Sequence, residues 1–268
     1  MANTVYSNVV LENKISDQLD TQLNVRGLMT MDDSLVENAG MIKKINTYAY
    51  SGSVENVAEG DGNSAYGEVS FSTSQYEVDV AQHSFQYTDE QFMTDPMVLE
   101  VGVKGGATVM ANDMTSKFFG QCALATLKQE YAHDASINYD TIVDAISLMN
   151  LEGENGLFLL IGTDLKAALR KDADFKASLQ GEILYTGQIG TISGVPVIVS
   201  KEVPADTAYL LTKEAITLYT KKDSEVEQDR DIEKRKNTIV MRRVNLVALT
   251  DATKIVKIVK GAEPTPGV

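Results

Sequence analysis

Residues 54–71 read VENVAEGDGNSAYGEVSF, which is a tip of glycine and acidic residues between two segments that alternate like β-strands. Strand-forming residues recur at every second position on both sides of the tip, at Ile45, Thr47 and Ala49 before it and at Val69, Phe71 and Thr73 after it. Tyr48 and Tyr50 occupy the opposite face of the first segment. Because a strand places successive side chains on opposite faces, the sequence predicts a long β-hairpin.

The apolar pattern changes phase after the hairpin. It moves from odd to even positions at Tyr76, Val78 and Val80, and it returns to odd positions by Phe85 and Tyr87. Each change of phase in a strand predicts a bulge or a bend. We therefore expect the second arm to leave the hairpin and to enter another sheet.

A long helix is predicted next. Thr94 and Asp95 can cap the first free amides, and Pro96 suits the first helical position because it has no N–H to satisfy. Apolar residues then follow at steps of three and four, at Val103, Ala107, Ala111, Met114, Phe118, Cys122 and Ala125. A helix from Pro96 to about Leu127 would be roughly 48 Å long. Three glycines in its first half, at positions 102, 105 and 106, predict a kink or another backbone lying close by.

Short helical and apolar segments alternate in the second half of the chain, in the order DTIVDAISLM, GLFLLIG, TDLKAALRK, GVPVIVS and AYLL. This alternation is typical of a compact α/β domain. The end of the chain, TIVMRRVNLVAL and KIVKIVK around the turn TDAT, predicts two further strands.

Composition restricts the class of protein. The chain has 268 residues, 43% of them hydrophobic, and a formal net charge of −14, which opposes tight binding to nucleic-acid phosphates. We expect no secretion signal and no membrane-spanning segment, because no apolar run reaches roughly 18 residues. Cys122 is the single cysteine, and we expect it to behave as a small buried apolar side chain.

The motifs do not support an enzyme or a cofactor. Gly60-Asp61-Gly62 lacks the remaining glycines and the helix of a dinucleotide fingerprint, and no nucleophile elbow occurs. Glu130 and His133 form one Glu-x-x-His pair, whereas a di-iron bundle needs two. We predict no catalytic residue, no cofactor and no metal. An alternative left open is an acidic calcium-stabilised adhesin module that uses Glu59, Asp61 and Asn63 as ligands.

Charge is distributed unevenly along the chain. Residues 46–103 contain ten carboxylates and no Lys or Arg, whereas residues 213–260 hold 12 of the 24 cations. This polarity suits head-to-tail contact between identical copies. The candidate basic counterparts in the contact are Arg230, Lys234, Arg235, Lys236, Arg242 and Arg243.

The stretch IGTISGVPVIVSKEVPADTAYLLTKEAITLYTKKDSEVEQDRD, residues 189–231, resembles the late part of tailed-phage major capsid proteins of the Hong Kong 97 fold. That family has a Gly-x-Pro-Val strand, a Val-Pro turn, a short strand and a Lys-x-Ala-Ile segment in this order. The resemblance in the order and kind of elements extends over nearly the whole chain. It implies an α+β fold with an N-terminal arm, an extended hairpin loop, a peripheral domain with a long spine helix, and an axial α/β domain.

The resemblance also implies boundaries for these parts. They are residues 1–44 for the arm, 45–74 for the loop, 75–135 and 237–262 for the peripheral domain with its spine helix, 136–236 for the axial domain and 263–268 for a tail. The tip, Glu59, Gly60, Asp61, Gly62 and Asn63, is then expected to contact a neighbouring subunit.

The function implied by the resemblance is that of a major capsid protein. Its copies would assemble through pentamers and hexamers into an icosahedral shell around double-stranded DNA, in the virion, after assembly in the host cytoplasm. The implied partners are other copies of the chain, a separate scaffolding protein, a portal protein, a possible decoration protein, and DNA without sequence-specific contact. The family's namesake joins subunits through a loop lysine, and the loop expected here has none, so we predict no such crosslink. An encapsulin-like cellular nanocompartment shell is the nearest alternative.

Overall fold

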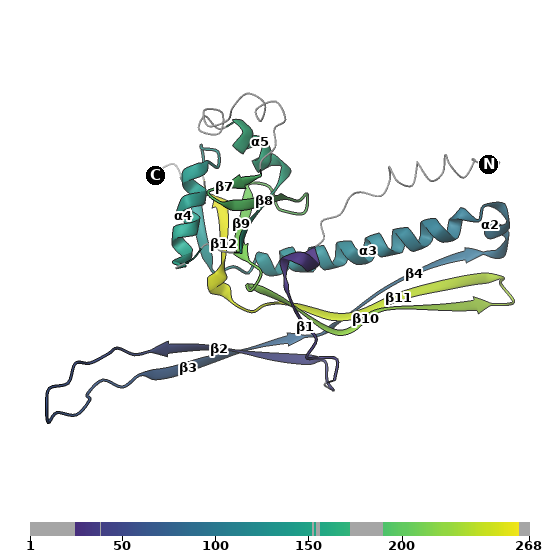
Figure 1. The fold of residues 1–268 in the computed structure, drawn as a ribbon. Helices are drawn as coiled ribbons and strands as arrows, with labels where there is room; N and C mark the ends of the chain where they lie inside the picture. Colours follow the sequence, from purple (N-terminus) through teal and green to yellow (C-terminus); the bar gives the residue numbers. More distant parts are fainter. Residues whose placement is uncertain (1–24, 38, 152, 154–155, 172–189, 263–268) are drawn as a thin grey trace, which may run out of the picture.

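The described residues form three β-sheets and one long helix, with shorter helices beside them, in the computed structural model shown in Figure 1. The structure describes residues 25–37, 39–151, 153, 156–171 and 190–262. A two-stranded sheet projects from a four-stranded sheet, and a six-stranded sheet forms a compact unit beside them. The mixed α+β class expected from the sequence is confirmed.

The hairpin consists of β2 (Ile42–Ser51) and β3 (Glu68–Glu77), which pair antiparallel from Ile42 opposite Glu77 to Ser51 opposite Glu68. The paired strands begin three residues before the expected loop, because the pairing continues to Ile42. Lys43 and Lys44 therefore belong to the base of the hairpin.

The four-stranded sheet receives the chain directly after the hairpin. Val78 interrupts the strand, is 3% exposed, and donates its backbone N–H to the carbonyl of Met41. The chain then continues as an outer strand of the next sheet, so the predicted change of sheet is confirmed. The order of this sheet is β1 (Thr30–Asp32), β10 (Ile216–Asp231), β11 (Lys236–Leu249) and β4 (Asp79–Thr88).

The second predicted change of phase is wrong. Strand β4 pairs with β11 in unbroken register from Asp79 opposite Asn245 to Thr88 opposite Lys236. Val80 lies on the exposed face of β4, so its apolar side chain did not mark the buried face as the pattern assumed. The irregularities of this sheet occur instead in β10, where the register shifts between Thr220 and Glu225.

Helix α3 (Met97–Cys122) lies along the four-stranded sheet, after the short helix α2 (Asp89–Thr94). The predicted start is confirmed, since Asp95 Oδ1 accepts from the N–H of Met97 at 3.0 Å. The helix ends five residues before the predicted Leu127. The residues after Cys122 form tight turns and then β5 (Leu127–Tyr131), where pairing with a parallel strand replaces the helix.

Two of the helix glycines allow α3 to approach the sheet. A Cβ on Gly102 would lie 2.2 Å from the ring of Phe85, and one on Gly106 would lie 2.9 Å from the sulfur of Met241. Gly105 has open space on its side. The close neighbours at Gly102 and Gly106 are therefore side chains of the sheet, and not the backbone that the sequence suggested.

The six-stranded sheet has the order β5, β12 (Ile255–Lys260), β9 (Thr207–Thr212), β6 (Leu157–Ile161), β8 (Val195–Val199) and β7 (Thr191–Ile192). Helices α4 (Tyr139–Met149) and α5 (Thr163–Lys171) contribute to one core, and the end of α3 contributes to the other. Cys122 is fully buried in the second core beside Phe118 and Tyr209, and burial raises the pKa of its thiol. The expected apolar role of Cys122 is confirmed.

The sheets do not divide the chain where the resemblance placed its boundaries. Strand β10 lies in the four-stranded sheet, although its residues fall within the range expected for the axial domain. Strands β5 and β12 lie in the six-stranded sheet, although they fall within the ranges expected for the peripheral domain. Both β10 and β11 are long enough to extend far beyond the compact unit (Figure 1). The expected arm, residues 1–44, lies outside the described residues as far as residue 24, and so does the tail, residues 263–268.

Candidate assembly interface

The hairpin β2–β3 projects away from both larger sheets and from α3 (Figure 1). A two-stranded hairpin is marginally stable by itself in water. Nevertheless its large apolar side chains lie in solvent, with Tyr48, Tyr50 and Phe71 between 66% and 73% exposed. An apolar surface on a projecting element is typical of a site that another molecule covers.

The two faces of the hairpin differ in chemistry. We call one the aromatic face, which carries Tyr48, Tyr50, Val69 and Phe71. We call the other the hydroxyl face, which carries Thr47, Ala49, Ser70, Ser72 and Ser74, with Ile45 opposite Ser74 at its base, where Ile45 packs against the body of the molecule. The register fixes this division, because residues opposite one another in an antiparallel pair share a face.

The tip of the hairpin is held by one carboxylate. Glu55 accepts hydrogen bonds from the N–H of Ser64 at 2.8 Å, the N–H of Ala65 at 2.9 Å and the hydroxyl of Ser64 at 2.7 Å. The bond from the Ser64 hydroxyl, followed by those from the two amides, lowers the pKa of Glu55. Gly60 has a φ of +96°, which glycine adopts without strain. The expected tip residues 59–63 therefore sit in an exposed turn, and Asn63 bonds within it to the carbonyl of Ala65.

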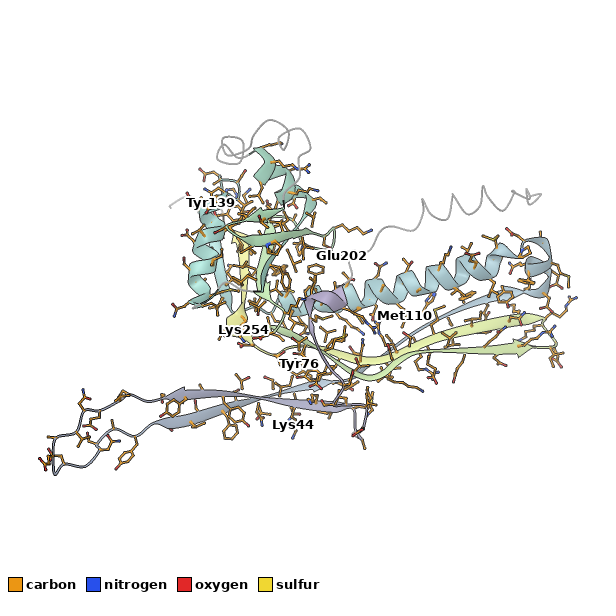
Figure 2. The ribbon with its side chains drawn as sticks, in the orientation of Figure 1. Lys44, Tyr76, Met110, Tyr139, Glu202 and Lys254 are labelled. Atoms are coloured by element: carbon orange, nitrogen blue, oxygen red, sulfur yellow. The ribbon has the colours of Figure 1, made fainter. Side chains whose placement is uncertain are left out.

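The base of the hairpin is anchored to the body of the molecule. The hydroxyl of Tyr76 donates to the carbonyl of Leu249 at 3.0 Å, and Figure 2 shows Tyr76 where the hairpin meets the larger sheet. Lys43 donates to the hydroxyl of Ser34 at 3.0 Å, and its ammonium lies 4.7 Å from the ring centre of Tyr219. These contacts fix the direction in which the hairpin projects.

Several of the candidate basic counterparts already pair within the chain, at the far end of the β10–β11 hairpin. Arg230 Nη2 lies 2.7 Å from Asp89 Oδ2, and Asn237 donates to the other oxygen of the same carboxylate at 2.9 Å. The hydrogen bond from Arg230, and then that from Asn237, lowers the pKa of Asp89. Arg235 lies 2.9 Å from Glu90.

Three other candidates, Lys234, Lys236 and Arg242, lie in or beside the same two strands. Lys234 lies 3.6 Å from Asp231, and Lys236 begins β11. Arg242 donates to Gln82 at 3.1 Å, and it lies 3.8 Å from Glu225.

Arg243 is 6% exposed and joins the sheet to α3. It donates to the carbonyl of Met110 at 3.2 Å and lies 3.6 Å from Asp113. Burial lowers the pKa of its guanidinium. Its charge therefore serves contacts within one chain. Arg242 and Arg243 are adjacent in the strand and point to opposite faces, and the sequence did not show which of the two faces α3.

An apolar groove of about 470 Å³ lies between α3 and the β10–β11 strands. Its lining includes Val103, Ala107, Met110, Val226 and Met241, and Figure 2 shows Met110 between the helix and the sheet. Arg26, Arg242 and Arg243 also line it. The groove offers no constellation of a nucleophile and a base that would suit catalysis.

The sequence pointed to the acidic tip and missed the aromatic face. The signal was present, since Tyr48, Tyr50, Val69 and Phe71 share a face once the two arms are paired through the tip. Reading it required the register, which the sequence did not supply.

Among the described residues, no group of three or more His, Cys, Asp or Glu side chains is arranged to hold a metal ion. Within the same part of the chain, no helix combines the length and the apolar character that crossing a membrane requires.

Known proteins resemble this chain over most of its length. A curated major capsid protein of Staphylococcus phage phiMR11 is 25% identical over 264 residues, which cover 94% of this chain and 93% of that protein. The mature capsid of bacteriophage PhiM1 has a similar structure, with a TM-score of 0.73, 12% identity, and coverage of 98% of this chain and 92% of that one. A virus-like particle from Pyrococcus furiosus has a TM-score of 0.59, 9% identity, and coverage of 93% and 96%.

A family model for phage capsid proteins matches residues 72–258. The match begins in β3 and ends in β12, so it includes three strands of the four-stranded sheet (β4, β10 and β11), α3 and nearly all of the compact sheet. It covers well over half of the chain, and the chain therefore belongs to the phage capsid protein family.

Proposed function

We propose that the chain is the major capsid protein of a tailed phage and that its copies assemble through pentamers and hexamers into an icosahedral shell around double-stranded DNA. The observation that carries this proposal is the projecting hairpin, whose apolar side chains lie in solvent within a chain of the phage capsid family. Such a hairpin gains its burial only when a neighbouring subunit is present.

The parts of the Hong Kong 97 fold are assigned by the order of elements. Helix α3 would be the spine helix and β2–β3 the extended loop. We propose that the four-stranded sheet with α3 forms the peripheral domain and that the six-stranded sheet forms the axial domain around the five-fold and six-fold axes. The sheet memberships of β5, β10 and β12 support this revised division.

The proposed partners follow from the same assignment. A separate scaffolding protein, a portal protein and a possible decoration protein would act with the shell, which would form in the host cytoplasm and become part of the virion. The net charge of −14 agrees with DNA held without specific contact, since a lining that bound phosphates tightly would hinder packaging and ejection. No crosslink from the hairpin is proposed, because the part of the hairpin beyond Lys44 contains no lysine.

Two alternatives receive less support. An encapsulin-like shell would share the fold, but the family model that matches is that of phage capsid proteins. A calcium-stabilised adhesin would use Glu59, Asp61 and Asn63 as ligands, but the family match of the chain is to phage capsid proteins. Capsid proteins are structural proteins, which agrees with the prediction that the chain is not an enzyme.

The test is electron microscopy of the purified protein across a concentration series, with mass photometry of the same samples. We expect rings, sheets or closed shells at high concentration. A particle that stays strictly monomeric at every concentration, with and without a co-expressed scaffolding protein, would contradict the proposal. Protein cargo in place of nucleic acid inside particles from the native source would favour the encapsulin-like alternative.

A further inference from the structure

We propose that the hairpin packs on a second copy of this chain through its aromatic face, and that its hydroxyl face stays in solvent. The inference rests on the proposed function, and it adds which side of the hairpin the assembly buries. The acidic tip is then a rim of the contact and not its centre.

The aromatic face forms one continuous patch. Tyr48 lies opposite Phe71 with ring centres 6.4 Å apart, and Tyr50 lies opposite Val69. The ring of Tyr50 lies over Gly52 and Gly67, where a Cβ would come within 2.6 Å and 2.1 Å of its hydroxyl oxygen. The backbone beyond the paired strands therefore follows the patch closely.

The area of the patch suits a specific interface. Its four side chains are between 62% and 73% exposed. Aromatic side chains bury about 150–250 Å² each, so at this exposure the patch supplies on the order of 400–600 Å², which is more than half of the roughly 800 Å² that each partner contributes to a standard interface. The serine and threonine side chains of the hydroxyl face supply far less apolar area.

The partner is a second copy, because no other described part of the chain covers this patch. The hairpin points away from α3 and from both larger sheets (Figure 1). The chain also belongs to a family whose members build capsids from many copies. A projecting patch that meets a different surface of the next copy gives a head-to-tail contact, and such contacts form closed rings when the rotation between neighbouring copies closes.

Ionic attraction is a weaker explanation for the contact. The paired part of the hairpin beyond Lys44 contains no cation, and the cations Arg230 and Arg235 are already matched with Asp89 and Glu90. Burial of aromatic rings is not screened by salt, whereas attraction between exposed charges is. We therefore expect the hairpin contact to persist at high ionic strength.

The test compares two cysteine variants at adjacent residues on opposite faces, Phe71→Cys and Ser72→Cys. The native Cys122 is fully buried, so the new thiol reports alone. Reaction with a maleimide is timed in dissociated subunits and in shells assembled from this chain alone. We expect both thiols to react quickly in subunits, and the thiol of Phe71→Cys to react at least about tenfold more slowly in shells, with Ser72→Cys unchanged.

The pair Val69→Cys and Ser70→Cys repeats the comparison in case Phe71→Cys weakens assembly. Loss of assembly in Phe71→Cys but not in Ser72→Cys also supports the inference. Shells in which both thiols react equally, in which only Ser72→Cys is protected, or in which protection needs an added decoration protein would overturn it while leaving the proposed function intact. A wild-type protein that forms no assembly under any condition would overturn both.

Discussion

The six-stranded sheet buries both of its faces within one chain, whereas the projecting part of the hairpin β2–β3, beyond its anchored base, leaves both of its faces in solvent. Along β6, Phe158 and Leu160 belong to one core and Leu157, Leu159 and Ile161 to the other, and all five are at most 4% exposed. In the hairpin, Phe71 is 70% exposed. The compact sheet is therefore stable within a monomer, while the hairpin gains its burial from assembly.

The largest effect we expect comes from truncating the core of the compact sheet. Leu160→Ala should lower the free energy of unfolding by about 2–5 kcal/mol, because the removed atoms leave a cavity in a fully buried site. Phe71→Ala is the matched change in the hairpin, and it should alter the unfolding of the dissociated subunit by less than about 0.5 kcal/mol. Denaturant titration of both variants measures the difference. Equal losses would show that the hairpin is part of the folding core.

In the layer between α3 and the four-stranded sheet, we expect losses of stability between those in the compact sheet and those in the hairpin. Substitution of Arg243 measures this layer. Arg243→Leu should destabilise the subunit by about 1–3 kcal/mol, because it removes a buried bond to the Met110 carbonyl and one of the two cations beside Asp113. Arg242→Leu is the adjacent control, and its side chain is 35% exposed, so we expect a loss below about 1 kcal/mol. Comparable effects of the two substitutions on the melting temperature would contradict the assignment of Arg243 to the contact within the chain.

Two glycines of α3 test the packing of the same layer, because we expect their substitution by alanine to change stability in opposite directions. Gly102→Ala should destabilise by about 1–3 kcal/mol, since the new methyl group would overlap the ring of Phe85. Gly105→Ala meets open space, so the lower chain entropy of alanine should stabilise the subunit by about 0.5–1 kcal/mol. Thermal unfolding of both variants checks the signs. A loss at Gly105 as large as that at Gly102 would mean that both sides of α3 are packed.

The sequence predicted the elements better than it predicted their partners. The hairpin arms, the start of α3 and the strands around residues 157–161 all follow from period and capping, which are local properties. The end of α3 was missed because pairing of Leu127–Tyr131 with β12 is a contact with the far end of the chain. Val80 misled the phase of β4 because an apolar side chain can lie on an exposed face.

The candidate interface shows the same limit. The sequence located the tip from its glycines and acids, but the preference for the aromatic face depends on the cross-strand register. The basic candidates were chosen because cations are frequent near the end of the sequence. The structure shows that Arg230 and Arg235 already pair with the carboxylates of Asp89 and Glu90. Charge counted along a sequence does not reveal which charges are already matched in space.

The smallest effect we expect concerns the tip, where Glu55 provides order without a core. Hydrogen bonds to the carboxylate lower its pKa below the ordinary value of 4.5. The ionised carboxylate therefore stabilises the tip fully above that value, and this stabilisation is lost as the pH falls through the lowered pKa. Hydrogen exchange of the Ser64 and Ala65 amides should therefore be slowed at neutral pH and should lose that protection on acidification. Glu55→Gln should weaken the protection and remove its dependence on pH, while Glu59→Gln, in the same exposed tip, should leave both unchanged. A wild-type tip whose exchange protection does not change between neutral and strongly acidic pH would show that the turn at Gly60, and not the carboxylate, holds the tip together.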